Sequence, residues 1–256
     1  MSRKRLSKSA AHLGAERGYR RSLGPAAGEV AFQVVVEQTD LHVVARLDLS
    51  SAVGSFLHGL RGPLAAYIAA RPEFLESLIP VEVPADAPAL VRAMAAAGQA
   101  CGVGPMAAVA GAIAQAVADR FAAESPDILV ENGGDCYLHS TRERTVALLA
   151  DPAGGPSLGL RLTPRDFPCS LCSSSASIGH SLSLGQGELV AVRAQSGALA
   201  DAAATALCNL LRTRRDLDRV LAAARTLQSA GVDGVFAQLG GAVAAWGKME
   251  LVALGA

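Results

Sequence analysis

The chain has 256 residues, enough for one large domain or two small ones, and its 51% hydrophobic content can bury a sizeable core. Lysine plus arginine and aspartate plus glutamate both number 23, and aromatic residues make up only 4%. This composition argues against electrostatic binding to nucleic acid or a membrane surface, and against base-stacking platforms.

The chain begins with a basic segment, MSRKRLSKSAAHLGAERGYRR, and no apolar region follows it, so we expect no secretory signal. We expect residues 1–16 to be a flexible basic arm and residues 17–256 to form a single domain. No uninterrupted apolar run reaches the roughly 18–20 residues of a membrane span. Five irregularly spaced cysteines are typical of reduced thiols, so we expect a cytoplasmic protein.

The first half of the chain predicts a hairpin followed by helices. Residues 31–49 hold two β-branched runs around a polar break, which is typical of a β-hairpin. Residues 50–70 have helical spacing, and Pro63 is expected to break or kink that helix. The further predicted elements are a short helical piece ending at Leu78, a loop over 79–88, a helix over 88–100 capped by Asp86, and a buried helix over 102–124 with Pro105 in its first turn.

The second half predicts more strands than helices. Residues 127–140 read as two strands joined by a tight turn at Gly133 and Gly134. Residues 166–187 are rich in serine and glycine and are expected to be irregular, which is often a sign of function. The remaining predictions are strands at 145–151, 157–163 and 188–194, a helix over 198–212 capped by Ser196, a helix over 216–230, and a C-terminal β meander.

Strands in this pattern come in pairs and groups, with helices between the groups. We therefore expect an α+β fold with a mostly antiparallel sheet, not a doubly wound fold. The sequence contains no internal repeat of fixed period and no clear linker.

Asp201 and Thr205 are the oxygen-bearing side chains of the alanine-rich stretch SGALADAAATALCN, and their spacing places both on one helix face. Mg²⁺ prefers oxygen ligands and often takes one or two carboxylates together with water and phosphate. The alternative is a plain core helix, in which Asp201 favours the helix dipole and Thr205 bonds back to a carbonyl. The spacing alone leaves both readings open.

The turn Asn132-Gly133-Gly134-Asp135 follows an apolar strand. Its paired glycines permit positive φ and allow a ligand to reach the backbone N–H groups. An ordinary hairpin turn fits the same residues.

His180 lies in a serine- and glycine-rich segment, where a histidine can act as a general acid or base. A surface-loop histidine is the alternative. The absence of a G-x-S-x-G motif argues against a serine hydrolase. The other histidines, His139 among them, have no partner evident in the sequence.

Cys169 and Cys172 form a single C-x-x-C pair. One pair is too few ligands for structural zinc, so a redox disulfide or two incidental thiols remain as readings.

Three of these features occur together in an order that resembles the ApbE family, the FAD:protein FMN transferases. The turn Asn132–Asp135 is similar to the family's N-x-G-G-D turn, and ADAAATA at 200–206 is similar to its A-D-A-x-x-T-A segment. Ser173 and Ser174, followed by His180, resemble its T-S-G stretch and the histidine after it.

The chain resembles an uncharacterised branch of this superfamily more closely. The similar segments are GPMAAVAGAIA at 104–114, GHSLS at 179–183 and TDL at 39–41. The resemblance covers residues 17–255, nearly the whole chain.

The resemblance implies an ApbE-like α+β fold with mostly antiparallel sheets, packed helices and a nucleotide cleft. It implies that FAD lies in this cleft with Mg²⁺ at its pyrophosphate. FAD is then split, and FMN is joined through phosphate to a Thr or Ser of an acceptor flavoprotein.

By position, the resemblance makes His180 the catalytic histidine and makes Asp201, Thr205 and the backbone carbonyl of Ala107 the metal ligands. The residues expected to line the flavin nucleotide site are Pro105, Met106, Asn132, Gly133, Gly134, Asp135, Ser173 and Ser174.

The chain also departs from the family pattern. Ala110 stands where the family usually has lysine, Gln115 replaces a frequent acidic residue, and Ser181 begins a run that replaces I-x-D-P. The sequence therefore leaves two functions open: an FMN transferase or FAD pyrophosphatase, and a non-catalytic flavin- or nucleotide-binding protein. It also leaves open whether the chain forms a homo-oligomer.

Overall fold

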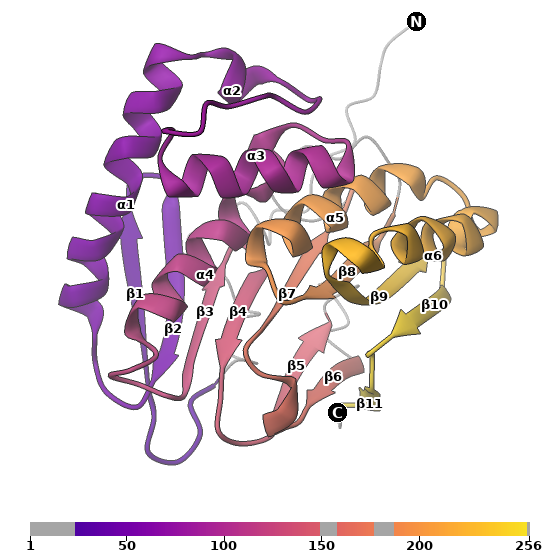
Figure 1. Ribbon diagram of the computed structural model, residues 1–256. Helices are drawn as coiled ribbons and strands as arrows, with labels where there is room; N and C mark the ends of the chain where they lie inside the picture. Colours follow the sequence, from indigo (N-terminus) through magenta and orange to yellow (C-terminus); the bar gives the residue numbers. More distant parts are fainter. Residues whose placement is uncertain (1–23, 149–157, 177–186, 255–256) are drawn as a thin grey trace, which may run out of the picture.

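The computed structural model describes residues 24–148, 158–176 and 187–254. Within these residues the main sheet has eight strands in the spatial order β1-β2-β3-β4-β7-β8-β9-β10, and every neighbouring pair is antiparallel (Figure 1). Its strands are β1 (Val30–Val36), β2 (Thr39–Ala45), β3 (Ile128–Asn132), β4 (Asp135–His139), β7 (Cys169–Ser174), β8 (Leu189–Ala194), β9 (Val232–Leu239) and β10 (Ala242–Gly247).

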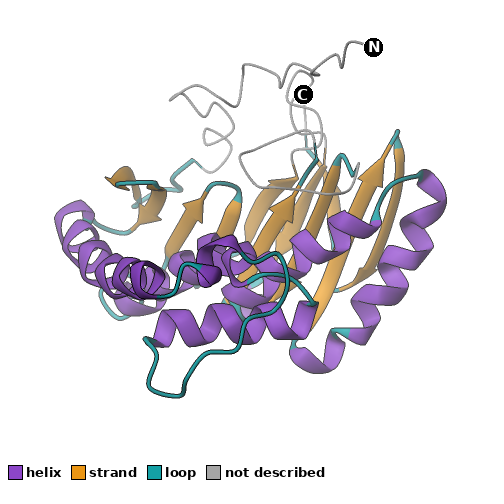
Figure 2. Cartoon of the chain, turned by 90° about the horizontal axis from the view of Figure 1, so that it is seen from above, coloured by secondary structure: helices purple, strands orange, loops and turns teal. Residues whose placement is uncertain are grey.

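A smaller antiparallel sheet, in the order β11-β6-β5, lies on one face of the main sheet. Its strands are β5 (Arg144–Leu148), β6 (Leu158–Leu162) and β11 (Leu251–Ala253). Helices cover the other face, as Figure 2 shows from above. They are α1 (Ser50–Ala70), α2 (Glu73–Glu76), α3 (Ala89–Cys101), α4 (Val109–Phe121), α5 (Gly197–Leu210) and α6 (Leu217–Thr226), with a short 3₁₀ helix η3 (Pro105–Ala108) before α4. The predicted α+β fold with mostly antiparallel sheets is confirmed.

Alternation along β4 and β7 divides their side chains between the two faces. Tyr137 of β4 packs into the core beneath the helices, whereas Leu138 packs against the small sheet. On β7, Cys172 packs beneath the helices and Leu171 against the small sheet. Both faces of these central strands are therefore buried, which explains their nearly continuous burial.

The antiparallel register gathers several connections at one edge of the main sheet. Leu41 of β2 pairs with Asn132, Asn132 pairs with Asp135 across the glycine turn, and Ser174 pairs with Val190. The TDL and NGGD motifs and the end of β7 therefore lie along the same edge, which we call the turn edge.

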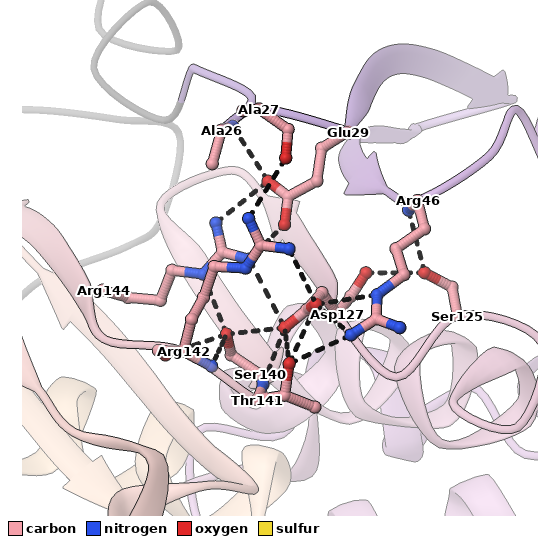
Figure 3. A network of polar contacts seen from close by, with 10 residues as sticks. All are labelled: Ala26, Ala27, Glu29, Arg46, Ser125, Asp127, Ser140, Thr141, Arg142 and Arg144. Atoms are coloured by element: carbon pink, nitrogen blue, oxygen red, sulfur yellow. Dashed lines mark hydrogen bonds and ion pairs between the residues drawn. The ribbon is translucent and has the colours of Figure 1, made fainter.

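The opposite edge holds a network of charged residues around Asp127 (Figure 3). Asp127 directly precedes β3, and its carboxylate accepts hydrogen bonds from the Arg46 guanidinium, Ser140 and Thr141. Arg144 joins the network and pairs with Glu29 before β1. This network ties the start of β1 to the far end of the β3–β4 hairpin, away from the turn edge.

Three local predictions from the sequence were wrong. Helix α1 runs unbroken through Pro63, because the proline and the Gly59 carbonyl, which loses its N–H donor there, lie on the exposed side of the helix, where water can donate to that carbonyl instead. Asp86 does not cap α3, which begins three residues beyond it, at Ala89, with Pro88 as the N-cap. Residues 166–187 are not wholly irregular, since β7 lies within them.

Two further predictions need smaller corrections. The helix predicted over 102–124 begins as the 3₁₀ turn η3 and becomes α-helical only at Val109. The C-terminal meander ends at β10, because β11 leaves it to pair with β6 in the small sheet. Residues 1–16 and the stretch 149–157, which joins the strands predicted at 145–151 and 157–163, lie outside the described residues.

Within the described residues, no single helix has both the length and the apolar character to cross a membrane. Helix α3 and the segment Pro105–Phe121 reach those limits only when taken together, and they are bent by 104° relative to each other.

Candidate functional site

The glycine turn between β3 and β4 is a tight hairpin held from both sides. Gly133 and Gly134 have φ values of 70° and 107°, which glycine adopts without strain. The Gly134 N–H donates to Glu131 Oε1 at 2.7 Å, and Ser173 Oγ of β7 donates to the Gly134 carbonyl at 3.2 Å. The hairpin reading of this turn is therefore correct, and β7 fixes its position.

Asp135 begins β4 and is buried on the helix-facing side of the sheet. Its Oδ1 accepts the Ser173 N–H at 3.1 Å, and the Cys172 thiol also donates to its carboxylate. Burial raises the pKa of Asp135 to about 7; these two hydrogen bonds oppose that rise, and the charge of Glu131 adds to it.

Asn132 and Asp201 meet the same short segment at the start of α4. Asn132 Nδ2 donates to the Ala110 carbonyl at 3.2 Å, and the Gly111 N–H donates to Asp201 Oδ2 at 2.9 Å. Ala110 and Gly111 therefore link the glycine turn to helix α5. This link passes through the position at which lysine is usual in the family.

Asp201 is the fifth residue of α5, so it lies beyond the first turn and does not complement the dipole of its own helix. Its carboxylate instead accepts N–H groups of Ala110 and Gly111 at the N-terminus of α4. Burial raises the pKa of Asp201 well above its usual value, and the nearby charge of Asp135 raises it further. The alternative interpretation as a core helix is therefore correct in that α5 is buried, but the Asp201 carboxylate stabilises the N-terminus of α4 and not that of its own helix.

The segments that carry the expected metal ligands are neighbours. Ala107 lies in η3, which packs directly against α5. Thr205 lies one helical turn after Asp201 and is half-buried, as are Met106 and Ala107, while Pro105 is buried. Carboxylate, hydroxyl and carbonyl oxygens are donors that suit a hard divalent cation.

Ser174, at the end of β7, has a buried hydroxyl that forms no hydrogen bond with any described residue. Two contacts show which part of helix α5 lies beside Ser174. The preceding Cys172 Sγ lies 3.7 Å from the Gly197 carbonyl, and Gly187, joined to the segment after β7, lies against Cys208. Ser174 therefore lies between these levels, beside the middle of α5, where a polar ligand would satisfy its hydroxyl.

The two buried aspartates lack a positive partner. Within the described part of the chain, neither Asp135 nor Asp201 forms an ion pair with a lysine, arginine or histidine. Two like charges in a buried place are costly unless they are protonated or meet a cation. No cluster of three or more His, Cys, Asp or Glu side chains suited to a metal occurs among the described residues, so hydroxyl or carbonyl oxygens would have to complete a cation site.

The C-x-x-C pair does not form a thiol site. Cys169 packs against the small sheet and Cys172 beneath the helices, so the two side chains point to opposite faces of β7. Three strand residues span about 10 Å, which is too far for a disulfide. Burial raises the pKa of Cys169 to about 11 and that of Cys172 well above its usual value, so neither is a ready thiolate.

His180 lies outside the described residues. Two residues within the described ranges were missed as members of this region. Cys172 was missed because β7 was read as irregular, which hid the alternation that turns it toward Asp135. Gln115 was noted only as a departure, although its Oε1 accepts the Gly197 N–H at 2.8 Å. Its place four residues after Gly111 was the available signal.

Comparison with known proteins gives consistent matches. Residues 21–245 match the protein-family model described as AbpE bacteria. A UPF0280 protein of Methanocorpusculum labreanum is 40% identical over 124 residues, which cover 47% of this chain and 50% of that protein. A UPF0280 protein of Methanocaldococcus jannaschii is 40% identical over 196 residues, which cover 74% of this chain and 79% of that protein. The chain spans about half the length of several of the curated relatives it matches.

The fold is also found in a solved structure. The flavin transferase ApbE from Vibrio cholerae matches with a TM-score of 0.57 and 12% sequence identity, over 86% of this chain and 97% of that chain. At this identity the likeness is one of fold: an α+β arrangement with mostly antiparallel sheets.

Proposed function

Because the chain belongs to the AbpE bacteria family, we propose that it is a magnesium-dependent enzyme acting on the flavin dinucleotide FAD. The family match confirms the resemblance seen in the NGGD and ADAAATA motifs. The reaction we propose is cleavage of the pyrophosphate, with the FMN half transferred to an acceptor hydroxyl or released to water.

The observation that carries the proposal is the buried pair of Asp135 and Asp201. Both carboxylates are nearly inaccessible, at 6% and 7% residue exposure, and no described lysine, arginine or histidine pairs with either. Burying two acids without a positive partner costs free energy, which the hydrogen bonds from Ser173 to Asp135 and from Gly111 to Asp201 offset only in part. A cation bound beside them would offset that cost.

The metal ligands in this proposal are Asp201, Thr205 and the Ala107 carbonyl. All three offer hard oxygen donors, and η3 and α5, which carry them, pack together. Waters and phosphate oxygens would complete the coordination, as is usual for Mg²⁺. When bound, the cation supplies charge neutralisation at the phosphates.

The predicted nucleotide-lining residues divide into two groups. Asn132, Asp135 and Ser173 already bond to neighbouring protein groups, so their proposed role is to hold the glycine turn in shape. Ser174 differs, because its buried hydroxyl has no described partner and is available to a ligand. Gly133 and Gly134 form the turn that Ser173, the residue before Ser174, holds through the Gly134 carbonyl, and Pro105 and Met106 would border the same site from η3.

The proposed chemistry needs one nucleophile and one proton acceptor. An acceptor hydroxyl attacks the phosphorus of the FMN half, the bond from that phosphorus to the bridging oxygen breaks, and AMP leaves with that oxygen. His180 takes the hydroxyl proton in this scheme. If water replaces the acceptor, the products are FMN and AMP.

A second function is favoured by Ala110. Its methyl group stands where the family usually has a lysine, and its backbone N–H and carbonyl serve Asp201 and Asn132. A protein that lacks this positive charge and binds a flavin nucleotide without turnover is the alternative.

One experiment separates the two functions. The purified chain is incubated with FAD, Mg²⁺ and a threonine-containing acceptor, and the products are resolved by liquid chromatography and mass spectrometry. The enzyme predicts AMP together with FMN or flavinylated acceptor, and predicts that His180→Ala keeps FAD binding but forms no product. Binding of FAD without any AMP would establish the non-catalytic alternative, and full activity of His180→Ala would remove His180 from the mechanism.

A further inference from the structure

Helices α4 and α5 contain closely related pentapeptides near their N-termini. Residues 111–115 read GAIAQ and residues 197–201 read GALAD. Each begins with a glycine and ends, one helical turn later, with a side chain that carries an sp² oxygen. In the first this side chain is Gln115, and in the second it is Asp201.

The two pentapeptides bind each other reciprocally. The Gly111 N–H donates to Asp201 Oδ2 at 2.9 Å, and the Gly197 N–H donates to Gln115 Oε1 at 2.8 Å. A Cβ atom on either glycine would overlap the carbonyl oxygen of the other. The helices therefore cross at backbone contact, and each supplies a hydrogen-bond acceptor to the N-terminus of its neighbour.

The other end of Gln115 is also anchored. Its Nε2 lies 3.2 Å from Asp119 Oδ2 and 3.4 Å from the Tyr137 hydroxyl. Asp119 Oδ1 in turn lies 2.7 Å from His139 Nε2 on β4. This chain of contacts orients the Gln115 side-chain amide. The amino group donates to the Asp119 carboxylate, so the amide oxygen points to Gly197 and accepts its N–H.

We propose that Gln115 is the positioning residue for Asp201. Two hydrogen bonds between the same two helical turns fix both the axial shift and the rotation of α5 relative to α4. Loss of the Gln115 bond frees the first turn of α5, and the Asp201 carboxylate moves with it. Asp119 and His139 hold Gln115 in place from the sheet side.

The effect on metal binding rests on the proposed function, but the effect on the Gly111 amide does not. Gln115 does not touch the Gly111 N–H, yet the proposal couples them through α5. Hydrogen exchange at the Gly111 amide therefore reports Asp201 placement without any metal, and Mn²⁺ affinity measured by electron paramagnetic resonance reports the same placement in the presence of metal.

The test compares three variants with the wild-type chain. Gln115→Met keeps the side-chain length but removes all three side-chain hydrogen bonds of residue 115. Gln115→Glu combined with Asp119→Asn keeps an oxygen acceptor at 115 and reverses the bond between the two residues, so that the donor is now at 119. Gln99→Met makes the same replacement at an exposed glutamine of α3 that has no role in the network.

We expect Gln115→Met to speed Gly111 exchange and to weaken Mn²⁺ binding by about tenfold each, the effect of one lost hydrogen bond. The double variant is expected to restore both to within about threefold, and Gln99→Met to change neither. If wild type binds no Mn²⁺, the proposed function fails and the exchange measurement alone decides the inference.

Gly111 exchange in Gln115→Met that stays within twofold of wild type overturns the proposal. A loss that the double variant does not restore also overturns it, because that result assigns the effect to general packing. If Gln115→Met does not fold, Gln115→Ala replaces it: Gly111 exchange about tenfold faster than wild type supports the proposal, and exchange within twofold of wild type overturns it.

Discussion

The backbone N–H of Gly111 donates to the Asp201 carboxylate at 2.9 Å, so the residue expected to bind a metal also serves the N-terminus of a second helix. The two roles are compatible, because an ionised carboxylate has about four lone-pair sites and the N–H groups of Ala110 and Gly111 fill only two of them. The same side chain therefore stabilises the packing of α4 against α5 and is a proposed ligand of the cation.

Glycine is required where α4 and α5 cross. Gly111→Ala is expected to destabilise the protein by about 1–3 kcal/mol or more, because the added methyl group overlaps the Gly197 carbonyl. Gly59→Ala, at an exposed position of α1 with no atom within 4 Å of the added methyl, is the matched control and is expected to stabilise by about 0.5–1 kcal/mol. Urea unfolding measures both. A neutral Gly111→Ala would contradict the close crossing.

The unpartnered hydroxyl of Ser174 predicts an unusual pair of effects. Ser174→Ala is expected to leave the ligand-free protein equally stable or more stable by about 1 kcal/mol, while weakening FAD binding. Ser170→Ala is the control on the same strand face: its hydroxyl donates to the Cys136 carbonyl at 2.9 Å, so its loss is expected to destabilise by about 1 kcal/mol. Thermal unfolding with and without FAD tests both, and equal destabilisation of the two variants would argue against a ligand role for Ser174.

The Asp127 network predicts a stability loss in acid. Burial alone would raise the pKa of Asp127, but hydrogen bonds from Thr141, Arg46 and Ser140 outweigh it and hold the pKa well below its usual value. A lowered folded pKa contributes stability that is present above the unfolded pKa and is lost as pH falls through the folded pKa. We therefore expect the free energy of unfolding to fall as the pH is lowered below about 4.

Asp127→Asn tests that network directly (Figure 3). The variant removes the charged acceptor shared by Arg46, Arg142 and Arg144, while Arg144 keeps Glu29 and Ser140, and it should cost about 1.5–3 kcal/mol at pH 7. Its unfolding free energy should also depend less on pH in acid than that of wild type. Guanidinium unfolding at several pH values measures this, and parallel pH profiles for the two proteins would contradict the role of Asp127.

The cysteines predict slow thiol chemistry in the folded protein. Cys169 and Cys172 point to opposite faces of β7, and burial raises the pKa of both thiols. Treatment with oxidised glutathione should leave no Cys169–Cys172 disulfide in peptide maps of the native protein. Detection of that bond before unfolding would contradict the strand assignment.

The elements that the sequence predicted well were those with strong local signals. The hairpin at Gly133 and Gly134 follows from paired glycines between apolar runs, and Ser196 caps α5 through a hydrogen bond from the Leu199 N–H, as expected. Strand β7 was missed because CSLCSS has few β-branched residues; its pairing with β4 and β8 determines its structure.

The candidate site was only partly predictable for a similar reason. Motif order placed Asp201, Ser174 and the glycine turn in one region, and the register of the sheet supports that grouping. Spacing within α5 could not show that Asp201 bonds to α4, because Gly111 lies 90 residues away in the sequence. Long-range partners of this kind depend on packing, which local patterns do not encode.

Calorimetric titration of FAD with and without Mg²⁺, on wild type and on Asp201→Asn, tests the central claim most directly. Asparagine keeps an acceptor for the Gly111 N–H, so the fold is expected to persist. The raised pKa of Asp201 means that ionising this buried acid lowers the free energy of unfolding as the pH rises. Asp201→Asn should therefore also stabilise the ligand-free protein at pH 8. We predict that Mg²⁺ strengthens FAD binding to wild type at pH 8 by at least about tenfold, and that Asp201→Asn binds FAD without this dependence. Absence of FAD binding to wild type, or an equal Mg²⁺ effect in both proteins, would contradict a cation site at Asp201.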